Sequence, residues 1–264
     1  MKKIIAIITG VNGEIGLSYT RHLLTRGINV IGIGRKERCA IGGIDYLCVN
    51  LLDKEQIGRI IQKIPFKDVE EILYFHLIGK FQFEDINHPI KDVDKDGIDD
   101  ETYSTNYSTF INLIEPLIEK IREEIRQKNR IKLSMTAIGS ISDKYSVERW
   151  QSFSKTKKIL KERMREIVDR YYLEDQARAT IINVSTVWGS QLAFERPQLY
   201  NKINKNLLYA DEIVLRSINT ILDRELHFCE KNIFKPREDF DYTIFTDLKK
   251  VDERWYKDMQ TFQN

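Results

Sequence analysis

The octapeptide Thr9–Gly16, TGVNGEIG, follows the apolar run Ile4–Ile8 and precedes LSYTRHLLTRG, whose apolar residues recur with helical spacing. Glycines between a buried strand and a helix let the backbone bend tightly and approach a ligand closely. The free N–H groups and the positive end of the helix attract a phosphate group. The stretch therefore predicts a dinucleotide-binding turn. Its place after the first strand favours this reading over the alternative, an ordinary tight turn whose glycines serve packing.

The rest of the chain continues the alternation of strand and helix. Short apolar runs predict strands at Ile4–Ile8, Val30–Ile33, Asp45–Val49, Ile72–Leu77, Ile131–Met135 and Thr180–Val184. Segments of helical period lie at Ile15–Arg26, Lys54–Lys63, about Asp100–Gln127, Val147–Tyr172 and Ala210–Leu222. Gly27 is placed to end the first helix and Asp53 to cap the second. Continuous apolar strands, each followed by a helix, predict an α/β fold: a Rossmann-type doubly wound parallel sheet with helices on both faces.

We find no repeat, low-complexity linker or clear domain boundary, and expect one domain over residues 1–264. The segment at about 186–210 would form a substrate lid, with Trp188, Phe194 and Tyr200 as an aromatic lining. Residues from about 230 to 264 are less regular. They would form a C-terminal extension with a strand around Tyr242–Phe245 and a short terminal helix.

Composition narrows the class of protein. The chain is 42% hydrophobic and 31% charged, with a net charge of only +2 and scattered basic residues, so we expect neither a nucleic-acid nor a membrane partner. Three cysteines without CxxC spacing indicate thiols in a reducing compartment. The apolar run near the start is too short for a signal peptide. We expect a cytoplasmic protein.

The end of the second strand bears on cofactor choice. It reads Ile33-Gly34-Arg35-Lys36, with no acidic residue to bind a ribose 2′-hydroxyl. Arg35 and Lys36 could pair with a 2′-phosphate instead. The sequence thus favours NADP over NAD, the alternative being a solvated basic turn.

From Lys2 to about Leu222 the chain resembles the short-chain dehydrogenase/reductase family. The family motif TGxxxGxG appears here with Glu14 at the middle glycine, whereas the variant TGxxGxxG is matched by Gly10, Gly13 and Gly16. Of the family's NNAG, only Gly79 is kept, in His76-Leu77-Ile78-Gly79. STNYSTFINLIEPLI matches the family's structural and proton-relay asparagine with Asn106, and YADEIVLRSINTIL resembles the helix after the substrate loop.

The catalytic elements depart from the family pattern. For the serine at the end of strand five the best match is Thr136, with Ser134 and Ser140 as rivals. For YxxxK, the segment QSFSK puts Gln151 at the tyrosine and Lys155 at the lysine. Glutamine has no transferable proton near neutral pH, and loss of a general acid typically costs about 10²–10⁴ in rate. Tyr145, or a water or the substrate itself, could supply the proton instead.

The resemblance implies hydride transfer between NADP(H), with NAD as the alternative, and a carbonyl or alcohol carbon of a small-molecule substrate. The rival is a protein that binds the dinucleotide without turnover, as a sensor or a partner of another enzyme. The implied catalytic set is Asn106, Thr136, Gln151, Lys155 and Tyr145. The implied cofactor set is Thr9, Gly10, Asn12, Gly13, Glu14, Ile15, Gly16, Arg35, Lys36, Asn50, Leu51, Gly79 and Lys155. Family members pair through two long helices, so we also expect a homodimer.

Two further signals have simpler readings. Asp92–Asp100, DVDKDGIDD, resembles a calcium loop, but its twelfth position is Tyr103 and not glutamate. We favour helix capping by Asp99 or Asp100 and expect no metal. His76 would lie either near the nicotinamide or buried against a strand end.

Overall fold

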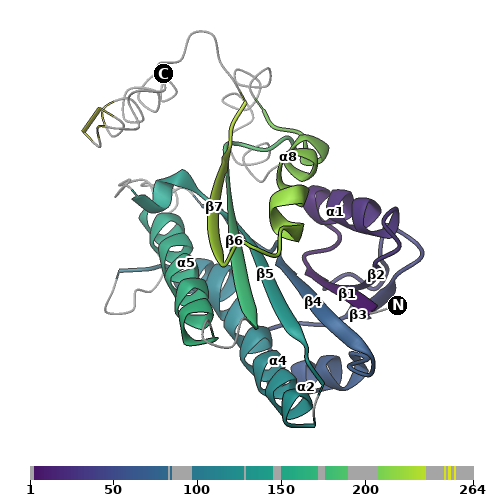
Figure 1. Ribbon diagram of the computed structural model, residues 1–264. Helices are drawn as coiled ribbons and strands as arrows, with labels where there is room; N and C mark the ends of the chain where they lie inside the picture. The colour runs from purple at the N-terminus through teal and green to yellow at the C-terminus, as the bar shows by residue number, and fades with distance from the viewer. Residues whose placement is uncertain are drawn as a thin grey trace.

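The computed structural model describes residues 3–82, 84, 97–127, 129–144, 150–171, 176–189, 207–235, 247, 249–250 and 253. These residues form a layered α/β structure, with one twisted sheet between two helical layers (Figure 1). The expected strand at Tyr242–Phe245 and terminal helix lie outside the described residues, apart from Asp247, Lys249, Lys250 and Glu253.

The described sheet has seven strands in the order β3-β2-β1-β4-β5-β6-β7, and every neighbouring pair is parallel. Their bounds are β1 Lys3–Thr9, β2 Asn29–Gly34, β3 Asp45–Cys48, β4 Val69–His76, β5 Lys132–Gly139, β6 Ala177–Val184 and β7 Phe228–Ile233. The predicted doubly wound sheet is confirmed.

The helices follow the predicted segments closely. They are α1 Glu14–Leu24, α2 Lys54–Lys63, α3 Asp100–Tyr103, the π-helical turn η1 Ser104–Ser108, α4 Thr109–Arg126, the 3₁₀ turn η2 Ile141–Lys144, α5 Gln151–Tyr171 and α8 Ala210–Leu222. Asp53 caps α2, since its Oδ1 accepts from the amides of Glu55 and Gln56. Gly27 ends α1 in the left-handed region, with φ +71°.

Two apolar cores, one on each face of the sheet, hold the helices. One core packs β-strand residues such as Ile7, Tyr74 and Met135 against α2, α4 and α5. The other packs residues such as Ile8 and Phe75 against α1 and α8. In Figure 1 these two helical groups lie on opposite sides of the sheet. Among the described helices, none combines the length and the apolar character needed to cross a membrane.

Candidate functional site

The sheet has its topological switch point beside β1. The chain proceeds from β1 outward to β2 and β3 on one side, and through β4 to β7 on the other. Loops leaving the carboxyl ends of β1 and β4 therefore diverge, and in open α/β sheets ligands bind in the crevice that this leaves. The predicted glycine turn follows β1, so it borders this crevice.

Two glycines of the turn, Gly10 and Gly16, are required by its geometry. Gly10 has φ +75°, and a Cβ there would lie 3.0 Å from the Leu77 carbonyl carbon. A Cβ on Gly16 would lie only 2.4 Å from the Gly10 carbonyl oxygen, so the first turn of α1 can pack on the loop only with glycine there. Gly13 is the N-cap of α1 and offers no capping side chain. α1 thus begins without a side-chain cap, and the backbone amides at the start of a helix attract anions.

Other residues of the predicted cofactor set have varied positions. Thr9 is buried, and its hydroxyl donates to the Phe75 carbonyl oxygen at 3.2 Å. Leu51 is also buried, and its carbonyl accepts from Asn112 Nδ2 at 2.9 Å. The others border the surface: Glu14, Arg35, Lys36 and Asn50 are exposed, whereas Asn12 and Ile15 are half-buried.

A second group of site residues surrounds Asn106, which is fully buried in the π-helical turn η1. Its Oδ1 accepts from the Lys80 amide at 2.6 Å, and its Nδ2 donates to the Lys80 carbonyl at 3.0 Å and to Thr156 Oγ1 at 3.1 Å. One side chain thus ties the loop after β4, which contains Gly79, to α5. The local π-turn orients Asn106 inward at this point.

The buried cation beside this network is Lys157. It is 3% exposed, and its Nζ donates to the Ile138 carbonyl at 2.9 Å. A Cβ on Gly79 would lie 3.3 Å from that Nζ, which places the ammonium beside the loop after β4. Burial lowers the pKa of Lys157 to about 8. The Lys157 ammonium can donate three hydrogen bonds. Among the described residues, the Ile138 carbonyl is the one acceptor within hydrogen-bond distance.

The predicted pair Gln151 and Lys155 lies elsewhere on α5. Gln151 is the first residue of the helix, and its amide donates to Glu84 Oε2 at 3.0 Å. Lys155 is two residues before Lys157, which turns its side chain about 200° away around the helix axis. The residue one turn before Lys157 is Phe153, whose ring centroid lies 5.7 Å from the Lys157 Nζ. Phe153 also contacts Phe81 edge-on, at 5.0 Å between ring centroids.

The placement of Thr136 at the end of strand five is wrong. β5 continues to Gly139, four residues beyond the predicted end, so Thr136 lies inside the strand. Since alternate strand residues face opposite sides and Met135 and Ala137 face α4 and α5, Thr136 faces the α1 and α8 layer. Ser134 shares that face. Ser140, the other rival, follows the strand directly and lies 2.9 Å, oxygen to oxygen, from Ser142.

His76 is buried at the end of β4, as one of its two readings predicted. Its Nδ1 lies 3.2 Å from Thr9 Oγ1 and 3.4 Å from the Tyr74 hydroxyl. Burial, with a contribution from the positive charge of Lys157, lowers the pKa of His76 to about 3. The imidazole is therefore neutral at physiological pH.

Several predicted features lie outside the described residues: Tyr145, Phe194, Tyr200 and the acidic residues Asp92, Asp94 and Asp96. Asp99 is described, and its Oδ2 accepts from the Thr102 amide at 2.8 Å, which confirms the helix cap. Among the described residues no group of His, Cys, Asp and Glu side chains could hold a metal ion. The two ends of the expected lid are joined by a parallel bridge between Val187 and Leu208.

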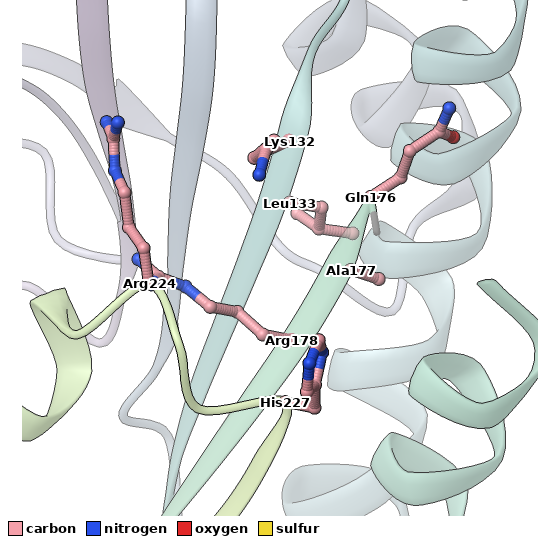
Figure 2. Close-up of a pocket in the computed structure, with 7 residues that line it drawn as sticks. All are labelled: Lys132, Leu133, Gln176, Ala177, Arg178, Arg224 and His227. Carbon is pink, nitrogen blue, oxygen red and sulfur yellow. The ribbon is translucent and has the colours of Figure 1, made fainter. Parts of the chain in front are cut away.

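A small pocket lies at the opposite, amino-terminal ends of β5 and β6 (Figure 2). Two arginines of the pocket share one buried carboxylate: Arg178 and Arg224 bind Glu71 at 2.5 and 3.0 Å, and Arg224 also binds Glu70 at 3.5 Å. The pocket therefore lies beside a structural ion network, at the end of the sheet opposite the glycine turn.

Similar folds occur among dehydrogenases of known structure. A 4-hydroxyisoleucine dehydrogenase complexed with NADH aligns over 90% of this chain and 100% of its own, with TM-score 0.69 and 14% identity. A short chain dehydrogenase from Burkholderia cenocepacia J2315 in complex with NADP aligns over 96% and 97%, with TM-score 0.68 and 13% identity. A short chain dehydrogenase from Leptospira borgpetersenii with bound NAD+ aligns over 89% and 92%, with TM-score 0.65 and 14% identity.

These similarities establish the fold. At this identity they do not carry residue roles, and no protein-family model matches the sequence.

Proposed function

We propose that the crevice at the carboxyl ends of β1 and β4 binds NADP(H), and that the protein transfers hydride between it and a carbonyl or alcohol carbon of a small molecule. The glycine turn carries the proposal, because Gly10, Gly13 and Gly16 leave the amides of α1 open to a pyrophosphate. Proteins of this fold with bound NADH, NAD+ and NADP support it.

Lys157, and not Lys155, is the lysine that we assign to the nicotinamide ribose. It is buried beside Gly79 with one carbonyl partner, so ribose hydroxyls would complete its hydrogen bonds. Asn106 is assigned a positioning role, since it holds the Lys80 backbone and α5 together.

With Lys157 as the lysine of YxxxK, the tyrosine position passes from Gln151 to Phe153. A phenyl ring keeps the shape of tyrosine but has no proton to give. This observation favours the second candidate function, a protein that binds the dinucleotide without turnover and acts as a sensor or partner. If there is turnover, the proton must come from water, the substrate or another side chain, such as Ser140 or Tyr145.

Titration of the purified protein with NADPH and NADH, followed by nicotinamide fluorescence, tests the proposal. We expect micromolar binding of NADPH that is tighter than binding of NADH. A carbonyl-substrate screen with bound NADPH then separates the candidates, since turnover supports the oxidoreductase and binding without turnover supports the sensor. Absence of binding by either nucleotide would overturn both.

We further propose a cytoplasmic homodimer formed through α4 and α5. These helices are joined within the chain by Arg163, which binds Glu115 at 2.9 Å, so they offer one common surface. Light scattering of the purified protein would give twice the 31.2 kDa chain mass if this is correct.

A further inference from the structure

The loop after β2 is fastened to the glycine turn by two side chains. Asn12, in the turn, accepts from the Ala40 amide through Oδ1 at 3.1 Å, and its Nδ2 donates to the Arg38 carbonyl at 3.5 Å. Tyr46, in β3, donates its hydroxyl proton to the Lys36 carbonyl at 2.5 Å. The Tyr46 hydroxyl also accepts from Asn12 Nδ2, at 3.1 Å. The Asn12–Tyr46 pair thus fixes the backbone at three alternate residues of one surface loop.

The strand end leaves space for this pair. A Cβ on Gly34 would lie 2.9 Å from the Tyr46 hydroxyl and 3.2 Å from Asn12 Nδ2, closer than such contacts normally allow. Glycine at the last position of β2 therefore lets the phenol and the amide meet beneath the loop. In the sequence, this glycine marks no more than the end of a strand.

The fastened loop carries a concentrated positive charge. Arg35, Lys36 and Arg38 are exposed, and with Glu37 they give three positive charges and one negative within four residues. Because the loop lies at the carboxyl end of β2, next to the glycine turn, its side chains border the adenosine end of the proposed dinucleotide crevice.

We propose that Tyr46 and Asn12 are specificity-determining positioning residues, which hold the Arg35–Arg38 loop where it selects a 2′-phosphate over a 2′-hydroxyl. The inference rests on the proposed function, because it concerns the same crevice. It goes beyond it by assigning discrimination to the Tyr46 hydroxyl, which acts through the Lys36 backbone and Asn12. Loss of that hydroxyl frees the Lys36 carbonyl, which is on an exposed residue and can bind water instead. The loop then loses its fixed position while the core of the fold is kept.

The test compares nucleotides that differ at the 2′ position. For Tyr46→Phe we expect the NADPH dissociation constant to rise about tenfold, while that of NADH changes less than about twofold. Adenosine 2′,5′-bisphosphate and 5′-AMP, used as competitors, should show the same contrast without the nicotinamide half. Tyr19→Phe is the matched control, because it removes a hydroxyl that is bonded to Ser217 of α8, not to the loop after β2, and should leave the ratio unchanged.

A double variant shows whether the hydroxyl acts through the loop. If it does, Arg35→Ala should lower NADPH preference, and adding Tyr46→Phe should lower it little further. If Tyr46→Phe weakens the binding of NADPH and NADH equally, or changes neither dissociation constant, the inference is overturned and the proposed function stands. Wild-type protein that binds NADPH and NADH equally would also overturn it. Wild-type protein that binds neither would overturn the proposed function and this inference with it.

Discussion

A phenyl ring and a phenol differ by one hydroxyl group, and at position 153 this difference separates the two candidate functions. Phe153 lies one helical turn before Lys157, with its ring near the Lys157 ammonium. For Phe153→Tyr we expect NADPH-dependent carbonyl turnover to rise about 10²-fold or more, because the new hydroxyl would supply a general acid beside a cation that lowers its pKa. The measurement is the initial rate of NADPH oxidation with a panel of carbonyl compounds.

Gln151→Tyr is the matched control for this gain. Gln151 begins α5 beside Glu84, so a tyrosine there should leave the rate unchanged. A gain in rate with Gln151→Tyr and none with Phe153→Tyr would show that Gln151 and Lys155, as predicted from the sequence, occupy the tyrosine and lysine positions.

The buried Lys157 ammonium lowers the free energy of unfolding of the protein, which an apolar side chain at this position would not do. Burial lowers its pKa from 10.5 to about 8, so the folded state disfavours the charged form. The unfolded chain binds more protons between these two pKa values, and stability therefore rises with pH across that window and is lowest below pH 8. We expect Lys157→Met to stabilise the apo protein at pH 7 by up to about 3 kcal/mol, with a gain that disappears toward pH 10.5.

The same substitution should weaken NADPH binding at least tenfold, since the ribose would lose its donor. Urea unfolding from pH 7 to 10 and NADPH titration give the two readouts, with Lys155→Met as the control. A Lys157→Met protein that is less stable at pH 7 and binds NADPH normally would mean that the ammonium only supports packing.

Among the elements, the glycine turn shows how backbone geometry constrains the sequence. A Cβ on Gly16 would meet the Gly10 carbonyl oxygen at 2.4 Å, and a clash with backbone cannot be relieved by a side-chain rotation. Gly16→Ala should therefore destabilise the protein by about 2–4 kcal/mol and abolish NADPH binding.

Gly58 in α2 is the matched comparison. A Cβ there would meet no atom within 4 Å, so Gly58→Ala should stabilise the protein by about 0.5–1 kcal/mol. Urea unfolding gives the free energy of unfolding of both variants. Equal changes in the two variants would contradict the role given to Gly16.

The central elements of the sheet can be predicted from the sequence because their apolar runs are continuous. β7, Phe228–Ile233, escapes prediction, since FCEKNI is an outer strand of the described sheet with mostly half-buried residues and no unbroken apolar run. The predicted end of β5 is too early because Thr136-Ala137-Ile138-Gly139 mixes small and polar residues. That error moves the expected serine position onto Thr136, which faces away from α5.

The register of α5 cannot be read from the sequence either. QSFSKTKK contains three lysines within four residues, and only packing shows that Lys157 is the buried one. By contrast, the sequence places Gly10 and Gly16 in the turn after β1, where the backbone leaves little room for a side chain.

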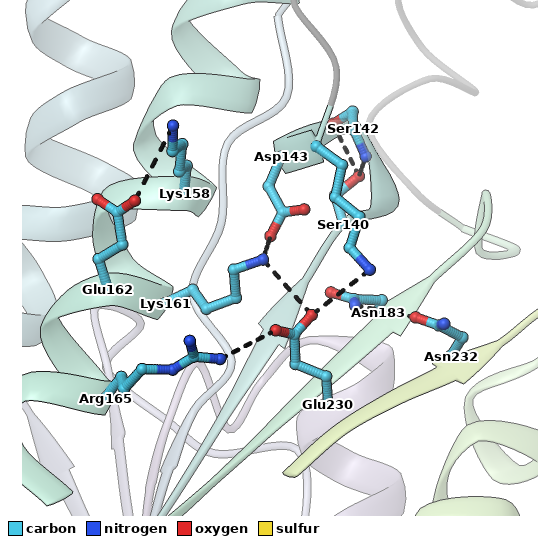
Figure 3. Close-up of polar contacts among 11 residues, drawn as sticks. Ser140, Ser142, Asp143, Lys158, Lys161, Glu162, Arg165, Asn183, Glu230 and Asn232 are labelled. Atoms are coloured by element: carbon cyan, nitrogen blue, oxygen red, sulfur yellow. Dashed lines mark hydrogen bonds and ion pairs between the residues drawn. The ribbon is translucent and has the colours of Figure 1, made fainter. Parts of the chain in front are cut away.

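At the scale of the whole molecule, an ion network joins three distant segments on the β7 side (Figure 3). Lys161 of α5 binds Asp143 of η2 at 2.6 Å and Glu230 of β7 at 3.4 Å, and Arg165 adds a contact to Glu230 at 3.5 Å. Burial raises the pKa of Asp143, against the opposing effect of Lys161. Because η2 directly follows Ser140, this network holds the end of β5 against α5 and β7.

Removal of the central cation should show how much the network matters. Lys161→Met leaves the buried Asp143 carboxylate without its ammonium, so we expect a loss of about 3 kcal/mol in the free energy of unfolding at pH 7. Without Lys161 the folded-state pKa of Asp143 rises further above its unfolded value. The carboxyl group then takes up a proton as the pH falls toward 5, and the loss becomes smaller. Urea unfolding at pH 5 and pH 7 measures the loss in the free energy of unfolding at each pH.

Lys158→Met is the control, since the Lys158–Glu162 pair spans 3.9 Å between two exposed side chains. Its removal should change the free energy of unfolding by less than about 0.5 kcal/mol. A Lys161→Met loss that is equal at both pH values would contradict this account, because it would show that protonation of Asp143 does not change the cost of removing the ammonium.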